Sequence, residues 1–331
     1  MEDYVLMVPL KPLSLQTQTP QKPLRYRERA LERAPESAID RALRMQGVVF
    51  CGLALMLSVA AVMFPQLIER TGLVVIAAII ILLGVPHGAL DTIFVRQLYH
   101  VRTVRGWTGF VVLYCVPSAL VVILWLIAPT VFLLGFLLIS AAHFSGDPAE
   151  GTRGLSRLWY GGAVIVLPNL WHAGEVSRLF GLLAGPAAAA FVMPWLTMLA
   201  LPWLVALVAS ALFEARRSRR TGVELLALGL LATIAPPLIA FTGFFCVMHS
   251  ARHILRTIEY AHDAPPRRLL IAGFLPMLAV FAMVAGGWLL LNDTPFDARL
   301  IQIVFVGLAA LTVPHMALVE RVRLSGWARQ A

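Results

Sequence analysis

The chain has 331 residues, of which 59% are hydrophobic and only 14% are charged, with a formal net charge of +9. Soluble domains carry roughly 25% charged residues, so this composition excludes an ordinary soluble protein. The length suits one membrane domain and leaves no room for a separate soluble catalytic domain.

Apolar segments follow one another along most of the chain. A transmembrane helix needs about 20 predominantly apolar residues, and the sequence predicts eight to ten such spans. In chain order they are 46–64, 72–94, 107–128, 130–146, 158–172, 187–213, 223–240, 241–256, 269–291 and 300–319. The number has a range because 158–172 is short and because Pro236 and Pro237 interrupt an apolar stretch. The predicted fold is all-α, a polytopic transmembrane helix bundle.

The spans divide the chain into three parts. Residues 1–45 are rich in proline and basic residues, and we expect a partly disordered cytoplasmic tail without a cleaved signal peptide. Residues 46–320 are expected to form the transmembrane catalytic domain. Residues 321–331 are expected to form a second cytoplasmic tail.

The basic residues predict the orientation of the spans. If the N-terminus is cytoplasmic and the spans alternate, only Arg70, Arg178 and Arg299 of the 27 Lys and Arg residues fall outside cytoplasmic segments. The positive-inside rule produces such a bias. We therefore expect a multi-pass protein of the cell (inner) membrane, in contact with lipid and without a nucleic-acid partner.

The histidines form the main chemical signal. Five of the eight lie in or at the end of an inward-going span: His87, His143, His249, His253 and His315. An ionisable residue within a span is energetically unfavourable and usually faces the bundle interior. All five are expected near the cytoplasmic ends of their helices, so they should converge. His100 and His262 lie in polar loops and His172 at the outer end of a span, and we expect all three to lie outside the cluster.

The pair His249 and His253 gives the strongest local pattern. Residues at i and i+4 share a helix face, so both rings can bind one metal ion. Arg252 between them is expected to interact with a carboxylate or to extend towards lipid headgroups. The sequence leaves open whether His315 is a further ligand or only hydrogen-bonds to a neighbouring helix.

Two carboxylates follow histidines at the same spacing. Asp91 stands four residues after His87, and Asp147 four residues after His143. Each carboxylate is expected to accept a hydrogen bond from its own histidine and so to fix the ring tautomer. Gly146 can end the second helix early and weaken that pairing.

Neutral imidazoles without thiolates suit iron, copper, nickel or zinc, and ligand type alone does not choose among them. Cys51, Cys115 and Cys246 lie far apart in sequence and indicate no zinc site. Four histidines leave open positions on an octahedral Fe(II) for O2. A site inside an apolar bundle excludes water and admits lipid-soluble molecules, which favours oxidation of a hydrophobic substrate over hydrolysis of a soluble one.

Four motifs in order resemble the Brp/Blh family of membrane-bound β-carotene 15,15′-dioxygenases of bacteria and archaea. They are Pro86-His87-Gly88-Ala89-Leu90-Asp91, His143-Phe144 with Asp147, His249-Ser250 with Arg252-His253, and Pro314-His315. The similarity runs from about residue 72 to residue 319.

The resemblance implies a specific reaction. Fe(2+) would be bound by His87, His143, His249 and His253, and O2 would be inserted across the central double bond of β-carotene to give two molecules of all-trans-retinal. A retinal-binding protein is then an expected recipient of the product. Two departures leave the choice of carotenoid and of cleavage position open. Ser145 follows His143-Phe144 where the family has glycine, and His172-Ala-Gly-Glu175 stands where the family has His-Pro-Glu-Glu. The sequence identifies no substrate-binding residue.

Three other classes of membrane protein use histidines. A haem-binding electron carrier would need opposed histidine pairs, whereas these histidines lie at one depth. A di-iron desaturase or hydroxylase would need an HxxHH sequence, which the chain lacks. A proton- or metal-coupled transporter could use the same residues as relay or transit sites, and helices interrupted at Pro86 or Pro236 would suit one.

Overall fold

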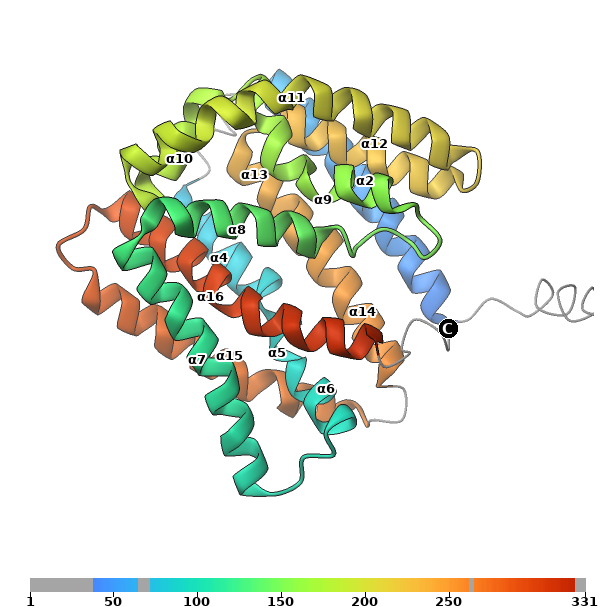
Figure 1. The fold of residues 1–331 in the computed structure, drawn as a ribbon. Coiled ribbons are helices and arrows are strands. Elements are labelled where there is room, and N and C mark those ends of the chain that lie inside the picture. Colours follow the sequence, from blue (N-terminus) through green and yellow to red (C-terminus); the bar gives the residue numbers. More distant parts are fainter. Residues whose placement is uncertain (1–37, 65–71, 262–264, 325–331) are drawn as a thin grey trace, which may run out of the picture.

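The structure, a computed structural model, describes residues 38–64, 72–261 and 265–324. Every regular element in these residues is a helix and none is a strand, which confirms the all-α prediction (Figure 1). The α-helices are α2 (Ala38–Met63), α4 (Leu73–Ile79), α5 (Pro86–Ala89), α6 (Asp91–Leu98), α7 (Val104–Ile127), α8 (Pro129–Phe144), α9 (Gly154–Val166), α10 (Ala173–Ala184), α11 (Pro186–Ala215), α12 (Arg219–Ile234), α13 (Pro237–Gly243), α14 (Ala251–Tyr260), α15 (Pro266–Leu290) and α16 (Phe296–Leu324). Two π-helices, η1 (Ile80–Gly84) and η3 (Phe244–Ser250), and the 3-10 helix η2 (Leu167–Leu170) join some of them.

Seven helical segments of the described chain are long and apolar enough to cross a membrane. They are Ala38–Met63, Leu73–Leu98, Val104–Ile127, Pro186–Ala215, Pro237–Tyr260, Ile271–Leu290 and Phe296–Arg321. A shorter apolar helix, Pro129–Phe144, adds to them. The chain is therefore a membrane protein built as a helix bundle. The predicted count of eight to ten spans is not confirmed by length and composition alone.

The predicted spans differ from the observed helices where the chain is irregular. The segment 158–172 is not one regular helix, because α9 has only 13 residues and passes into the 3-10 helix η2. The predicted boundary between 223–240 and 241–256 is wrong. The helix α12 ends at Ile234, before Pro236, because proline disfavours helical backbone in the preceding residue.

The boundaries of the predicted tails also shift. Residues 1–37 and 325–331 lie outside the described residues. Residues 38–45, assigned to the N-terminal tail, already belong to α2. Likewise, 321–324 continue α16. The amphipathic helix α10 was not predicted.

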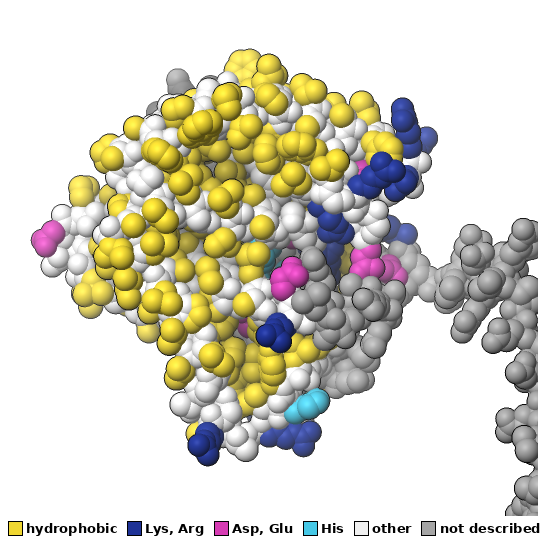
Figure 2. Space-filling model, in the orientation of Figure 1, with side chains coloured by type: hydrophobic (Ala, Val, Ile, Leu, Met, Phe, Trp, Pro, Cys, Tyr) yellow, Lys and Arg dark blue, Asp and Glu magenta, His cyan; other side chains and the backbone are white. Residues whose placement is uncertain are grey.

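The outer surface of the bundle is apolar. Large hydrophobic side chains such as Leu113, Leu126 and Leu138 are exposed, and Figure 2 shows one face covered largely by hydrophobic side chains, with Lys and Arg mainly near its edges. An exposed apolar area of this extent would be unfavourable in water and is expected in lipid.

Segments predicted to be cytoplasmic come together at one end of the bundle. A guanidinium NH2 group of Arg220, after the turn between α11 and α12, donates to the carbonyl of Leu43 in α2. Arg256 of α14 donates to the carbonyl of Gly146, 3.1 Å away, in the loop between α8 and α9. The start of α2 and the end of α16 also lie on the same side of the molecule (Figure 1).

Helices that carry histidines occupy the interior. The share of buried residues is 67% in Pro237–Tyr260 and 39% in both Leu73–Leu98 and Phe296–Arg321. It is at most 28% in the remaining four segments. These three segments carry His87, His249, His253 and His315, which thus lie on the long segments with the largest buried shares.

The two π-helices lie beside each other. The hydroxyl of Ser250 in η3 donates to the carbonyls of Leu83 and Gly84 in η1, at 2.9 and 2.8 Å. A π-helix inserts an extra residue, and such insertions are common at functional sites. A Cβ atom on Gly84 would lie 2.3 Å from the ring of Phe245, so only glycine allows this approach. The insertions set the direction of the histidines that follow them.

Candidate metal centre

Five histidine rings meet inside the bundle. His87 comes from α5, His143 from α8, His249 from η3, His253 from α14 and His315 from α16. Neighbouring ring centroids are 4.5 Å apart for His143 and His249 and 4.8 Å apart for His87 and His249. His315 lies 5.0 to 5.2 Å from the rings of His87, His143 and His253. The predicted convergence is confirmed, and it includes His315.

The protein fixes the Nδ1 atom of three rings. Nδ1 of His87 lies 2.6 Å from the carbonyl oxygen of Gly84. Nδ1 of His249 lies 2.9 and 3.0 Å from the two carboxylate oxygens of Asp147. Nδ1 of His315 lies 2.7 Å from a carboxylate oxygen of Asp91. A carbonyl or ionised carboxylate can only accept, so Nδ1 carries the proton and Nε2 keeps its lone pair.

The Nε2 atoms are the nitrogen atoms of the site that are available to bind a metal ion. Those of His249, His253 and His315 are buried and have no hydrogen-bond partner among the described residues. A buried polar atom without a partner costs about 1–3 kcal/mol, so three in one cluster call for an explanation. A bound metal ion provides it, because imidazole Nε2 is a common ligand atom.

Two groups of three ligand atoms are each spaced closely enough to hold a metal ion. His87, His143 and His315 each offer a nitrogen, and the three atoms lie within 4.8 Å of one another. Asp91, His253 and His315 offer a second such group. The shared member, His315, links the two sets. A donor set of imidazoles with carboxylates behind them suits a first-row transition metal.

The partners of the two carboxylates correct the sequence-based pairing. Asp91 does not bond to His87, because α5 ends at Ala89 and a new helix starts at Asp91, so the two residues no longer share a face. Asp147 does not bond to His143, because α8 ends at Phe144 and Asp147 lies in the loop beyond it. Each carboxylate instead joins a histidine from a distant helix.

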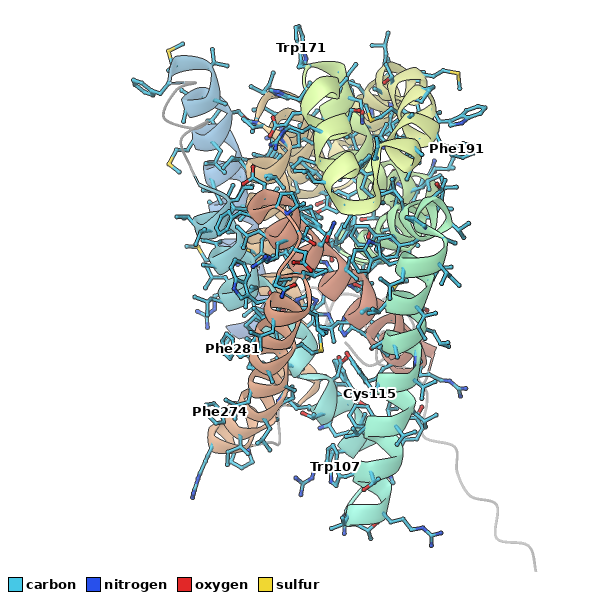
Figure 3. The ribbon with its side chains drawn as sticks, turned by 90° about the vertical axis from the view of Figure 1, so that its left-hand side faces the viewer. Trp107, Cys115, Trp171, Phe191, Phe274 and Phe281 are labelled. Atoms are coloured by element: carbon cyan, nitrogen blue, oxygen red, sulfur yellow. The ribbon has the colours of Figure 1, made fainter. Side chains whose placement is uncertain are left out.

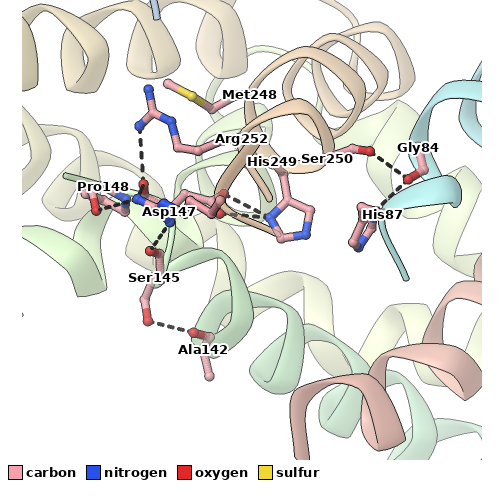
Figure 4. A network of polar contacts seen from close by, with 12 residues as sticks. Gly84, His87, Ala142, Ser145, Asp147, Pro148, Met248, His249, Ser250 and Arg252 are labelled. Atoms are coloured by element: carbon pink, nitrogen blue, oxygen red, sulfur yellow. Dashed lines mark hydrogen bonds and ion pairs between the residues drawn. The ribbon is translucent and has the colours of Figure 1, made fainter. Parts of the chain in front are cut away.

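Three arginines hold the loop that carries Asp147. Arg252 donates to the carbonyl of Asp147 at 3.2 Å, and Arg256 donates to the same carbonyl at 2.9 Å. Arg157 donates to the carbonyl of Ser145 at 3.2 Å. Figure 4 shows the contacts that connect Arg252, Asp147 and His249. The loop is thus fixed at its backbone while its carboxylate orients a histidine.

Arg252 is not an interfacial arginine that extends towards lipid headgroups. It is 2% exposed, and its guanidinium forms two 2.9 Å bonds with the carboxylate of Glu224. It also donates to Oε1 of Gln46, 2.9 Å away. The pairing with a carboxylate, the other reading of the sequence, is the correct one.

Several residues of the site were missed by sequence reasoning. Glu224 and Gln46 complete the surroundings of Arg252, and Tyr114 of α7 donates from its hydroxyl to Asp91 at 2.9 Å. Glu224 carried a signal, since a lone acid inside an apolar segment usually has a partner. Tyr114 and Gln46 carried none, because tyrosine and glutamine occur on many helix faces.

The remaining described histidines lie outside the cluster. Nε2 of His172 lies 3.1 Å from the carbonyl of Ile234, at the end of α12 where the next residues cannot continue the helix. His100 lies in a loop and has a φ of 49°. His262 lies outside the described residues.

A cavity of about 1170 Å³ opens beside the cluster. His87, His143 and His315 form part of its wall, and most other lining residues are apolar. Its volume is at the upper end of the range for small-molecule sites, about 300–1000 Å³. The site therefore combines nitrogen donors with room for a large apolar molecule.

The sequence profile and the known proteins that match this chain carry the same enzyme name. The sequence profile described as β-carotene 15,15′-dioxygenase matches residues 78–322. The chain is 31% identical over 255 residues to a β-carotene 15,15′-dioxygenase of an uncultured marine bacterium, 66A03, covering 73% of this chain and 91% of that protein. It is 26% identical over 284 residues to the probable β-carotene 15,15′-dioxygenase Blh of Halobacterium salinarum, covering 72% of this chain and 81% of the relative. No solved structure gives a significant match.

Proposed function

Because this chain belongs to the β-carotene 15,15′-dioxygenase family, we propose that it cleaves β-carotene with O2 at the central 15,15′ double bond. The products are two molecules of all-trans-retinal, and each aldehyde takes one oxygen atom of O2, so no reductant is needed. The observation that carries the proposal is the cluster of five histidines, three of which line a largely apolar cavity of about 1170 Å³.

The donor set is consistent with Fe(2+). His87, His143, His249 and His253 are the proposed ligands, as the family resemblance implies, and the unpartnered Nε2 of His315 makes it a fifth candidate. Iron(II) bound there would supply the activation of O2 that a non-haem histidine site provides in other oxygenases.

The surrounding residues prepare the site for that chemistry. Asp147 and Asp91 keep the protons of His249 and His315 on Nδ1, so that both Nε2 atoms point their lone pairs into the cluster. Burial of the rings excludes bulk water from the reacting groups. The apolar cavity wall binds the polyene by burying its surface.

The proposal also includes the membrane topology of the chain. We infer that α8, α9 and α12 cross the bilayer as short helices, which gives ten spans with both described ends on one side. Arg220, Arg256 and Arg157 gather at that end, and the positive-inside rule assigns such an end to the cytoplasm. The proposed location is the inner membrane of the cell with residues 46–320 as the catalytic domain, and a retinal-binding protein is a proposed recipient of the product.

Pigment analysis of β-carotene-producing bacterial cells tests the function. Expression of the chain should deplete β-carotene and release retinal, whereas His249→Ala at equal expression should leave the carotene intact. Oxygen exclusion should have the same effect as the substitution. Unchanged carotene beside well-inserted, iron-loaded protein would exclude β-carotene as the substrate.

Replacing each proposed metal ligand in turn tests which histidines bind the metal ion. His87→Ala, His143→Ala and His253→Ala should each abolish retinal formation and lower bound iron. His172→Ala should retain both, since its ring bonds only to the carbonyl of Ile234 among the described residues. His172→Ala is thus a matched control for the loss of an imidazole.

A further inference from the structure

The cavity beside the histidines forms a trough to which two helices, α7 and α15, contribute the longest rows of lining residues. The α7 residues that line it recur every three or four positions from Trp107 to Val122, and those of α15 recur likewise from Ile271 to Met283. Each helix therefore turns one stripe of side chains to the cavity. At 1.5 Å per residue, the stripes extend over about 22 Å and about 18 Å.

The two helices lie at the periphery of the bundle. No residue of α7 is buried, and no residue of the apolar stretch Ile271–Leu290 in α15 is buried. The helix α7 packs on α16 and α8, and α15 packs on α5, α6 and α16. Each is thus supported from one side and faces the surroundings on the other.

Residues that line the trough are also exposed at the surface. Val111 is 52% exposed, Leu275 65% and Met283 47%, although all three line the cavity. The cavity is therefore open to the outside along the gap between α7 and α15. Its surroundings are apolar, since Phe274 and Phe281 on α15 are exposed too. Figure 3 shows Trp107 and Cys115 on the side of α7 towards α15.

The middle of the α7 stripe is connected to the histidines. Tyr114 lies seven residues from Trp107 and eight from Val122. Its hydroxyl donates to Asp91 at 2.9 Å, and Asp91 accepts from Nδ1 of His315 at 2.7 Å. A long molecule in the trough would extend about equally, roughly 11 Å, to either side of this point.

We propose that the gap between α7 and α15 is the portal through which the carotenoid passes from the lipid into the cavity, and that the bound polyene lies along α7 with its middle at Tyr114. This inference rests on the proposed function and adds the route and the position of the substrate. The occupant is a long, apolar polyene, because the trough is long and most of its lining residues are apolar.

The native Cys115 reports directly on the portal. It is exposed and lines the trough, whereas Cys246 is buried. Full-length protein in lipid vesicles is treated without O2 with a membrane-permeant maleimide, and modification of Cys115 is followed by peptide mass spectrometry. Saturating β-carotene should slow modification of Cys115 by at least about tenfold, because the polyene would cover the thiol.

A matched variant gives the control. Leu113 lies two positions away on the same helix, is exposed and is not among the cavity residues. In Leu113→Cys combined with Cys115→Ala, β-carotene should leave the modification rate of the new thiol unchanged. A reversible bulky disulfide on Cys115 should also prevent β-carotene binding, measured as pigment retained by the vesicle protein, and a reductant should restore it.

The outcomes separate the portal from the function. If β-carotene is bound and cleaved while Cys115 is modified at the same rate with and without it, the portal is wrong and the function stands. If pigment is neither retained nor cleaved by iron-loaded protein, the proposed function fails and the portal fails with it. Protection of Cys115 but not of the control thiol supports the portal.

Discussion

At the scale of single residues, the carboxylates behind the histidines matter most. Asp147 accepts from Nδ1 of His249 with both oxygens. Replacement Asp147→Asn offers an amide that can donate to Nδ1 and favour the wrong tautomer. Loss of such a partner typically lowers metal affinity about 10–100-fold. We expect this loss for iron, measured by titration of the apoprotein, while exposed Glu150→Gln in the same loop should leave affinity unchanged.

A second residue-scale prediction concerns the buried ion pair. Glu224 and Arg252 are 3% and 2% exposed at their side chains and 2.9 Å apart. Arg252→Met leaves the Glu224 carboxylate buried with Arg220 as its one remaining ionic partner among the described residues, and breaking a buried pair costs about 3–5 kcal/mol. We expect a large fall in the unfolding temperature in detergent. The double variant Arg252→Met with Glu224→Gln should recover part of it; no recovery would contradict an uncompensated charge as the cause.

The residue types of the site could be predicted from the sequence, but not their partners. The i and i+4 spacing pairs His249 with His253 on one regular helix, whereas the structure places His249 in the π-helix η3 and His253 in α14. Asp91 was assigned to His87 by the same rule and belongs to His315, 224 positions away. A helix interruption of one residue at Leu90 changes the face, and nothing in the composition of that segment distinguishes it from continuous helix.

At the scale of elements, the two π-helices affect where three of the histidines point, since His249 lies in η3 and His87 and His253 follow η1 and η3 by three residues. Both π-helices lie in apolar segments whose sequences predict a regular α-helix. The extra residue of each π-helix is stabilised by contacts with the other segment, and one segment's sequence alone does not show these contacts. The Ser250 hydroxyl and the Gly84 carbonyl supply one such contact at 2.8 Å. The sequence therefore predicts the seven long apolar segments but not their irregularities.

The contact between the π-helices gives an element-scale prediction. In Gly84→Ala the new Cβ would lie 2.3 Å from the Phe245 ring, and overpacking typically costs about 1–3 kcal/mol. We expect a lower unfolding temperature together with reduced iron binding, since His87 follows directly. Gly135→Ala is the control, because nothing lies within 4 Å of its Cβ position. Equal effects in both variants would show that the contact is unimportant.

At the scale of the whole molecule, the histidine cluster joins segments that are far apart in the chain. His87 and His315 are separated by most of the described sequence, and their rings lie 5.2 Å apart. A metal ion that binds only the folded arrangement stabilises it by about 2.7 kcal/mol when present at 100 times its dissociation constant. The metal should therefore act as a link across the bundle as well as a reactant.

Iron removal tests this link. At about 2.1 cal/mol/K of unfolding entropy per residue, 1 kcal/mol corresponds to about 1.4 °C in the unfolding temperature of a chain this long, so chelation should lower it by about 4 °C and added Fe(2+) should restore it. His249→Ala should unfold at a temperature that no longer responds to iron, which separates specific binding from general effects of the chelator. A single transition is expected in both forms, because the ligands come from α5, α8, η3, α14 and α16, elements spread over most of the length of the chain. Two transitions in the iron-free protein would instead show that the metal joins two units that are separately stable.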